Sequence, residues 1–428
     1  MNSAARSFRN TFRSLKNRNY RLFFSGHGFS LIGTHMQRVA LGWLVYELTG
    51  SALMLGIVAF SREAAVALLA PLAGIAADRW DRKPTLFISQ MLLTVQAFTI
   101  AFLVYFEVIT IRHIIILSVF HGVIAALEIP VRQSFVVDMV TRKSELANAI
   151  ALNSSIFNAA MLVGPAVAGI VIAYYGEAVC FFINAFTYFS MLAALFMIKV
   201  GPRAANKEKA DVLGGLKEGF VYAFDFVPIR YILILVGTVS LVALPYMMLL
   251  PIFAGDVLQG GPRALGFLTG SAGLGALTGA IFLASRKSVR GLGRVIAGST
   301  LILGLALAGF ALSRDLRLSL VLIYFAGFGA MIQRSASNII LQTIVDDDKR
   351  GRIMSFYVVA LVSMLAAGDL LTGSVASVIG APLMMFFGGL VCIGCSLGVF
   401  KKLPYIRKFV HPIYARQGIM TKVKPELQ

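Results

Sequence analysis

Long apolar runs dominate this sequence and leave few folds open to it. A helix needs about 20 apolar residues to cross a hydrocarbon core about 30 Å thick. About twelve runs meet that length, and they predict twelve transmembrane helices and an all-α membrane protein. Their approximate bounds are 20–46, 52–77, 85–107, 112–137, 146–174, 178–199, 229–254, 263–286, 292–312, 317–343, 351–377 and 382–403.

Charged residues are few in this chain, and most of them are positive. Charged residues make up 14% of the sequence, against about a quarter in a soluble domain, and the net charge is +19. With both termini cytoplasmic, 31 of the 39 Lys and Arg residues fall in cytoplasmic loops and tails and only 4 in outer loops, as the positive-inside rule requires. We therefore expect a multi-pass protein of the cell (inner) membrane whose basic side meets lipid headgroups, with no nucleic-acid partner.

The longest polar break divides the chain into two halves. Residues 200–228 are predicted to be a cytoplasmic linker with an amphipathic helix that begins near Leu216. Residues 1–199 then form an N-terminal six-helix bundle, and residues 229–428 form a C-terminal six-helix bundle with a basic tail. The two bundles are expected to be pseudo-symmetric, because similar short sequence segments follow the fourth span of each half. The first basic segment, which ends near Arg21, has no apolar core and does not indicate a cleavable signal peptide.

A charged loop between the second and third spans carries the most specific motif. Its residues are Gly74, Asp78, Arg79, Arg82 and Lys83. The spacing resembles the G-x-x-x-D-[RK]-x-G-[RK]-[RK] loop of the major facilitator superfamily. The match departs at Asp81, where that superfamily usually has glycine.

This resemblance implies the major facilitator fold and a gating role for the loop. An acid near the end of the fourth helix, here Asp138, is then expected to pair with Arg82. Asp78 is expected to lie near the N-terminal end of the eleventh helix, around residues 351–355, when the inner gate is closed.

Further short sequence motifs resemble one branch of the superfamily, the enterobactin-exporter-like and macrolide-efflux-like proteins. They are residues 17–25, residues 37–51 and the acid-x-Pro-x-Arg-Gln pattern of residues 128–133. The fifth span contains Gly164, Pro165 and Gly169, which resemble an antiporter motif in which Ala160 and Ala168 replace two glycines. Generic packing of small residues explains the same pattern, so this motif alone does not indicate export.

Charged and polar residues within the spans are candidates for function, because a charge in the membrane is costly. In the superfamily the first, fourth, seventh and tenth helices line the substrate cavity. The resemblance therefore places Arg38, Glu128, Arg132, Gln333, Arg334 and Tyr246 in that cavity. Glu128 and Arg132 share a helix face. Arg62 and Glu63 are neighbours about 100° apart, so we expect Glu63 to pair with Arg38 at similar depth rather than with Arg62.

Three carboxylates within spans are candidates for proton coupling. Glu128 is the first choice because Arg132 lies one turn away, Glu63 is the second with Arg38 as its partner, and Asp369 is the third because no charged partner is evident. His27 and His35 are expected to pack or line the cavity rather than bind a metal. Cys392 and Cys395 sit within the last span and are read as packing residues.

These observations predict a secondary active transporter that exports a small amphipathic molecule, such as a drug, a siderophore or a related metabolite, by alternating access. We expect a monomeric proton antiporter without cofactor or metal. The sequence contains no phosphate-binding loop of the G-x-x-x-x-G-K-[ST] type. The alternatives are an importer of a sugar or an organic acid and, in another class, a membrane-embedded enzyme or receptor on a transporter scaffold.

Overall fold

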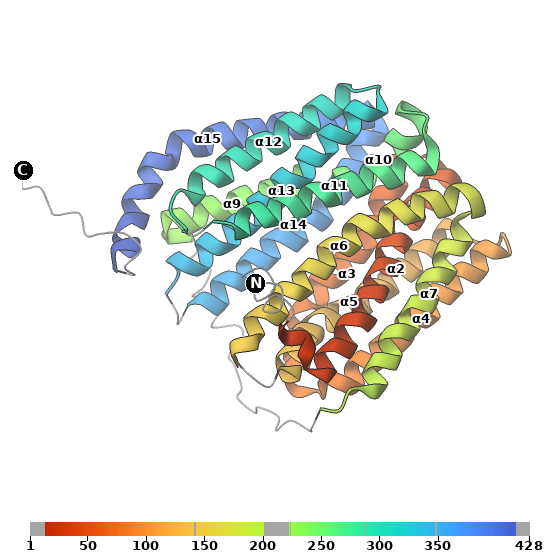
Figure 1. Ribbon diagram of the computed structural model, residues 1–428. Helices are drawn as coiled ribbons and strands as arrows, with labels where there is room; N and C mark the ends of the chain where they lie inside the picture. Colours follow the sequence, from red (N-terminus) through yellow and green to blue (C-terminus); the bar gives the residue numbers. More distant parts are fainter. Residues whose placement is uncertain are drawn as a thin grey trace, which may run out of the picture. The chain divides into compact units, whose positions relative to one another are not determined.

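A computed structural model describes residues 13–140, 143–200, 222, 224–286, 288–346 and 349–416, and these residues are almost entirely helical (Figure 1). The N-terminal half contains η1 (Arg13–Lys16), α2 (Arg18–Thr49), α3 (Ala52–Arg79), α4 (Arg82–Tyr105), α5 (Ile111–Met139), α6 (Lys143–Tyr175) and α7 (Glu177–Met197). The C-terminal half contains α9 (Val227–Val242), α10 (Tyr246–Ile252), η2 (Phe253–Val257), α11 (Gly261–Ala284), α12 (Leu292–Leu312), α13 (Leu316–Ile344), α14 (Arg350–Ile379) and α15 (Ala381–Arg416).

The helices confirm the predicted all-α membrane fold. Within the described residues, eleven helical segments are long and apolar enough to span a membrane. The 32-residue α2 is the further long helix, and its interior holds His27, His35, Gln37 and Arg38, which make it more polar than the others. Most helix bounds lie within a few residues of the predicted runs, because capping residues such as Asn17 and Thr110 stand where the apolar runs begin.

Two spans differ from their predicted form. The seventh is divided into α9, α10 and the π-helical segment η2. Pro245 lies in the interruption and Pro251 lies inside α10, and neither residue has an N–H group to continue the helical hydrogen bonds. The twelfth span continues as α15 through Pro404 and Pro412 to Arg416, thirteen residues beyond its predicted end. The apolar pattern ends earlier because this extension is basic.

A short turn precedes α2 and contacts α6. Residues 13–16 form one 3₁₀ turn, and Arg18 already belongs to α2. Ser14 is buried, and its hydroxyl donates to the Asn148 side chain of α6 at 2.8 Å. The turn is therefore held against α6. The first half of the basic tail and the predicted linker helix at residues 216–224 lie largely outside the described residues.

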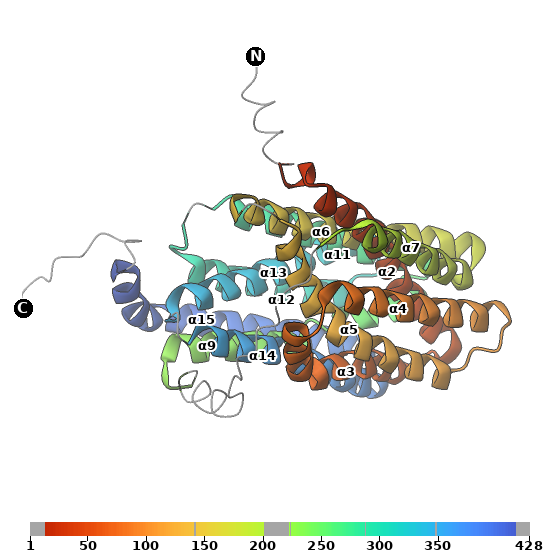
Figure 2. The same ribbon diagram turned by 90° about the horizontal axis from the view of Figure 1, so that it is seen from below.

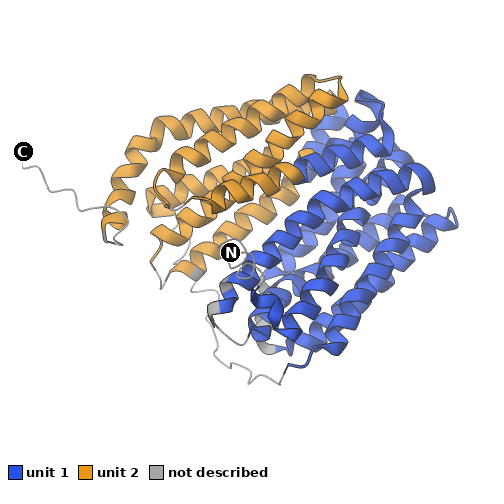
Figure 3. Cartoon of the chain, in the orientation of Figure 1, with its two compact units in different colours: residues 1–208, 247–273, 369–378 blue, residues 209–246, 274–368, 379–428 orange. Residues whose placement is uncertain are grey.

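The chain divides into two compact units (Figure 3). Unit 1 comprises residues 1–208, 247–273 and 369–378, and unit 2 comprises residues 209–246, 274–368 and 379–428. One change of unit, between residues 208 and 209, falls within residues 200–228, and parts of three later spans, residues 247–273 and 369–378, group with the N-terminal helices. The bundle boundaries themselves stay a prediction.

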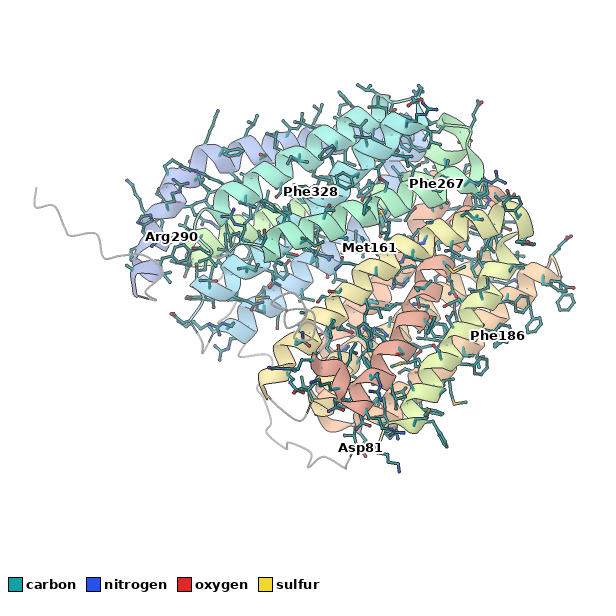
Figure 4. All side chains as sticks on the ribbon, in the orientation of Figure 1. Asp81, Met161, Phe186, Phe267, Arg290 and Phe328 are labelled. Carbon is teal, nitrogen blue, oxygen red and sulfur yellow. The ribbon has the colours of Figure 1, made fainter. Side chains whose placement is uncertain are left out.

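Within unit 1, α2 packs closely on α7, and α4 runs beside α7 (Figures 1 and 2). Glycine permits the approach of α2, since a Cβ on Gly26 would lie 2.7 Å from the Ser190 carbonyl oxygen. Polar residues join the same helices, because Asn184 donates to Gln37 at 2.5 Å and Gln37 donates to Gln96 at 3.2 Å. On the other face of α7, Phe186 points away from the unit and is exposed, as a lipid-facing residue should be (Figure 4).

Glycine pairs also bring the later segments of unit 1 against its N-terminal helices. A Cβ on Gly56 of α3 would lie 2.6 Å from the Asp369 carbonyl oxygen and 3.0 Å from Gly373 on α14. A Cβ on Gly169 of α6 would lie 2.8 Å from Gly266 on α11. These two helix crossings leave no room for larger side chains.

Unit 2 is built around α12, α13 and α15. A Cβ on Gly304 would lie 2.7 Å from the Gly389 carbonyl oxygen, and one on Gly329 would lie 2.6 Å from the Ser299 carbonyl oxygen. The buried Ser396 hydroxyl donates to the Ala297 carbonyl at 2.7 Å. The described part of unit 2 therefore uses the same small-residue packing as unit 1.

Candidate functional site

The basic end of the loop motif is anchored within unit 1. Arg82 donates through one guanidinium nitrogen to both carboxylate oxygens of Asp138 at 2.7 Å and to the Ser134 carbonyl at 3.1 Å. Lys83 donates to the Ile198 carbonyl at 2.6 Å. The structure thus contains the expected Arg82–Asp138 pair. Two of the motif cations thereby connect the start of α4 to the ends of α5 and α7.

Asp81 occupies the motif position where glycine is usual. It stands immediately before α4 with φ −63°, which is an ordinary backbone conformation for an L-residue. Aspartate therefore replaces glycine at this position without backbone strain, and Asp81 lies at an end of the unit 1 helices (Figure 4). Gly74, Asp78 and Arg79 lie on α3, but their side chains fall outside the described part, so the expected role of Asp78 stays a prediction.

A second polar group lies between α5 and α2. Arg132 donates through Nε to Glu128 at 2.8 Å, and its terminal nitrogen lies 2.8 Å from Nε2 of His27. Because arginine carries only donors, His27 must accept this hydrogen bond and is therefore the neutral imidazole. His27 and Glu128 are buried, at 4% and 8% exposure, and the imidazole stacks on Phe23 at 5.3 Å. Arg132 is therefore held by two acceptors that can each bind a proton.

The sequence-based prediction for Arg62 and Glu63 was wrong. These neighbours form an ion pair on α3, although their side chains leave the helix about 100° apart. The long, flexible arginine side chain can bend back to the adjacent carboxylate, which the angular argument ignored. No direct Arg38–Glu63 pair occurs within the described residues, but the charge of Glu63 acts on Arg38.

Asp369 has charged neighbours that the sequence did not reveal. It is buried at 5% exposure, and it interacts electrostatically with Glu63, Arg38 and Arg62. The cause is the glycine crossing of α3 and α14: Gly56 contacts Asp369 and Gly373, and Glu63 lies two turns from Gly56 on the same face of α3. Two arginines and two carboxylates therefore form a mixed-charge cluster in unit 1.

Arg38 belongs to this cluster and has two unusual properties. It lies in the interior of α2, where the surrounding protein partly desolvates it, and its side chain is nevertheless exposed. No hydrogen bond or ion pair to its side chain occurs among the described residues. Among the neighbouring charges, Arg62 has the largest effect on Arg38 and repels it. The charges of Glu63 and Asp369 attract Arg38 and have smaller effects.

The other predicted cavity residues lie in unit 2. Arg334 is exposed in the interior of α13, whereas Gln333 is buried at 2% exposure with an Nε2 group that has no hydrogen-bond partner in the described part. Tyr246 begins α10 and is buried at 5% exposure. Their assignment to a substrate cavity stays a prediction.

The antiporter-like residues of α6 serve as close packing points. A Cβ on Gly164 would lie 2.8 Å from the Cβ of His35 on α2, and Gly169 contacts Gly266 as described above. Pro165 lies between them inside α6. These small residues therefore do allow close helix packing, which was the alternative explanation of the motif. A role of the motif in export stays a prediction.

Sequence reasoning missed one hydrogen bond that joins distant segments of unit 1. The Tyr46 hydroxyl donates to Asp256 at 2.5 Å, which connects the end of α2 to η2. A second contact between distant segments of unit 1 places the Arg263 guanidinium 4.4 Å from the centroid of the Tyr174 ring. No sequence signal indicated either contact, because both depend on how segments far apart in the chain are packed.

Comparisons with known proteins agree with this architecture. A family model described as "Transmembrane secretion effector" matches residues 9–415. The staphyloferrin A transporter of Staphylococcus aureus (strain NCTC 8325 / PS 47) is 26% identical over 360 residues, covering 84% of this chain and 89% of that protein. The multidrug efflux pump Tap of Mycolicibacterium fortuitum is 24% identical over 377 residues, covering 84% and 91%.

Solved structures of transporters share the fold. The nucleoside transporter NupG superposes with a TM-score of 0.71 at 12% identity, covering 90% of this chain and 99% of that one. A POT family transporter in complex with 5-aminolevulinic acid superposes with a TM-score of 0.73 at 12% identity, covering 91% and 97%. At such low identity these structures support the twelve-helix fold and carry no information on substrate.

Proposed function

This chain belongs to the transmembrane secretion effector family of major facilitator transporters, and from that premise we propose that it exports a small amphipathic molecule in exchange for protons. The family and the relatives are transporters rather than enzymes. The direction of transport is inferred from the family description and from the efflux pump among the relatives. We place the protein as a monomer in the cell (inner) membrane, surrounded by lipid, with both termini cytoplasmic.

The observation that carries proton coupling is the position of Arg132 between Glu128 and His27. A proton on Glu128 removes the charge that holds the guanidinium, and a proton on His27 converts its acceptor nitrogen into a donor. Either event releases Arg132 from one partner. Proton binding and release can therefore change the position of a charged side chain between α2 and α5, which is the property that a coupling site needs.

Glu63 and Asp369 are the second and third candidates for the proton. Both belong to the mixed-charge cluster, where each carboxylate interacts with the other and with the two arginines. We place Glu128 first, because Arg132 contacts it directly and the group of Glu128, Arg132 and His27 is complete within α2 and α5.

Alternating access also requires that one end of the helices opens while the other closes. We propose that the Arg82–Asp138 pair anchors the cytoplasmic loop during this change, and that the crossings of Gly56 with Gly373 and of Gly169 with Gly266 lie at the opposite, outer ends of the helices. In this proposal Asp78 contributes to the inner gate, as the superfamily motif implies.

The function is tested by a resistance panel in an efflux-deficient bacterial host. The full chain is expressed and the host is challenged with cationic dyes, neutral macrolides and anionic iron chelators. We expect a several-fold rise in the inhibitory concentration for at least one class, abolished by Glu128→Gln. No protection, together with increased accumulation of a compound, would contradict export.

An importer of an organic acid is the second candidate, and the unpaired Arg38 favours it. An anion bound near Glu63 and Asp369 makes the cluster more negative and so favours a proton on one of them. Anion and proton would then bind together and move in the same direction. Energised accumulation of a carboxylic acid by the host, dependent on the proton gradient, would support this candidate over export.

A further inference from the structure

We propose that Arg38 is an anion-binding group of the transport site, so that the transported molecule carries a carboxylate or a comparable anionic group. This inference deepens the proposed function and rests on it only in taking this site to be where the substrate binds. It names the chemical class of the substrate and leaves the direction of transport open.

We infer that the Arg38 side chain faces protein and water rather than lipid. Gly42 and Tyr46 follow it by one and two turns and lie on the same face of α2. A Cβ on Gly42 would lie 3.5 Å from Pro251, and Tyr46 binds Asp256, so this face is covered by residues 251–256. One turn earlier, the Arg38 side chain is exposed. A guanidinium in a membrane span needs such an aqueous surrounding, because burial in lipid is costly.

The Arg38 guanidinium is available to bind a ligand. The guanidinium has no hydrogen bond or ion pair to any described residue, whereas the nearby Arg62 is occupied by Glu63. Arginine presents a planar set of donors that matches a carboxylate in a two-point contact. A second positive charge from Arg62 acts at the same place and adds to the attraction for an anion.

The remaining ionisable neighbours do not remove this preference. Glu63 and Asp369 reduce the positive potential at Arg38, and both arginines also act on the buried His35 and His121. With both carboxylates ionised and both imidazoles neutral, the cluster is electrically neutral. Its solvent-exposed member is Arg38, whereas Asp369 is buried, so an entering anion meets the cation first.

The anion site is separate from the proposed proton site. Arg38 follows His27 by eleven residues on α2, a distance of about 16 Å along the helix axis. The anion and the proton are therefore bound by different residues of the same unit, Arg38 on α2 and Glu128 on α5.

The inference is tested by binding of citrate to the purified full chain in nanodiscs. The sequence contains two tryptophans, and Trp43 is buried on α2 five residues from Arg38. A Trp80→Phe background makes Trp43 the sole fluorescent reporter. We expect a saturable change in Trp43 fluorescence with citrate at pH 7, and no saturable change with tetraphenylphosphonium or sorbitol.

Three variants with opposite expectations make the test specific. Arg38→Gln should raise the citrate Kd at least tenfold, whereas Arg38→Lys should retain part of the affinity because it keeps the charge. Asp369→Asn should lower the Kd, because it removes a negative charge from the cluster. Arg112→Gln, at the exposed start of α5, is the matched control and should leave the Kd unchanged.

Several results would overturn the assignment. They are the absence of saturable citrate binding by the wild type, unchanged affinity in a monodisperse Arg38→Gln variant, or saturable binding of tetraphenylphosphonium alone. The measurement needs no proton gradient and no direction of transport. Retained citrate binding with no proton-driven transport would therefore refute the proposed exchange and leave the anion site intact.

Discussion

At the scale of single residues, the central feature is an arginine shared between two proton acceptors. Arg132 contacts Glu128 on its own helix and His27 on α2. Helical spacing predicted the first contact, because residues four apart share a face. It could not predict the second, because nothing in the sequence states which face of α2 turns toward α5.

The role of His27 gives the first prediction. His27→Gln keeps a hydrogen-bond acceptor for Arg132 but cannot take up a proton, whereas His27→Ala leaves the arginine with one partner. We expect His27→Gln to retain transport, because glutamine still accepts the hydrogen bond from Arg132. His27→Ala should lose most activity. Equal transport by His27→Gln and His27→Ala would show that the hydrogen bond to Arg132 is not needed.

A second prediction concerns the cost of leaving a buried charge without its partner. Arg132→Ala leaves Glu128, which is 8% exposed, without its ion-pair partner, and such losses are strongly destabilising. We expect a thermal midpoint lower by several degrees and little transport, measured by fluorescence-detected unfolding in detergent. Arg112→Ala at an exposed helix end serves as the control. Equal, small effects of both substitutions would show that Arg132 is not held as described.

At the scale of helices, glycine decides which elements approach each other. The crossing of α3 and α14 at Gly56 and Gly373 is what places Asp369 among Glu63, Arg38 and Arg62. A larger side chain at Gly56 would meet the backbone of α14, which cannot move aside as a flexible side chain can. The charge cluster therefore depends on residues that carry no charge.

The third prediction follows from this crossing. Gly56→Leu should separate α3 from α14 and reduce transport at least tenfold while the chain still inserts in the membrane. Gly298→Leu on α12 is the matched control, since a Cβ there meets nothing within 4 Å. Transport of a fluorescent substrate in vesicles, normalised to the amount of protein, measures both. Full activity of Gly56→Leu would show that the crossing is not needed.

A fourth prediction concerns the hydrogen bond between α2 and η2. Tyr46→Phe removes the hydroxyl that binds Asp256 and keeps the ring that packs 5.2 Å from Trp43. We expect the residues 251–256 to separate from α2 more often, so that a cysteine introduced at Gly42 reacts faster with a membrane-impermeant maleimide. An unchanged rate of labelling would mean that the hydrogen bond does not hold these segments together.

The elements also show what a sequence can and cannot predict. Apolar length located twelve spans, and capping residues such as Asn17 placed their ends. The interruption of the seventh span at Pro245 had a local cause that the length criterion ignored. Ion pairs between helices were predictable where a known motif supplied the partner, as for Arg82 and Asp138, and not where the partner depended on helix crossings, as for Asp369.

At the scale of the whole molecule, different groups of residues have different proposed roles. The loop motif anchors helix ends through Arg82, the group of Glu128, Arg132 and His27 takes the proton, and Arg38 takes an anion. Outward movement of an anion is also favoured by a membrane potential that is negative inside, by about 2.3 kcal/mol per charge at 100 mV. Exchange for protons adds further driving force in the same direction.

The most direct test is proton-driven transport in proteoliposomes that contain the purified chain and a substrate identified by the resistance panel. An imposed proton gradient should move the substrate against its concentration gradient and opposite to the protons. Glu128→Gln should abolish this uphill movement and preserve downhill exchange. Coupling would be refuted if the wild type ignored the gradient. The assignment to Glu128 would be refuted if Glu128→Gln still concentrated the substrate and Asp369→Asn alone did not.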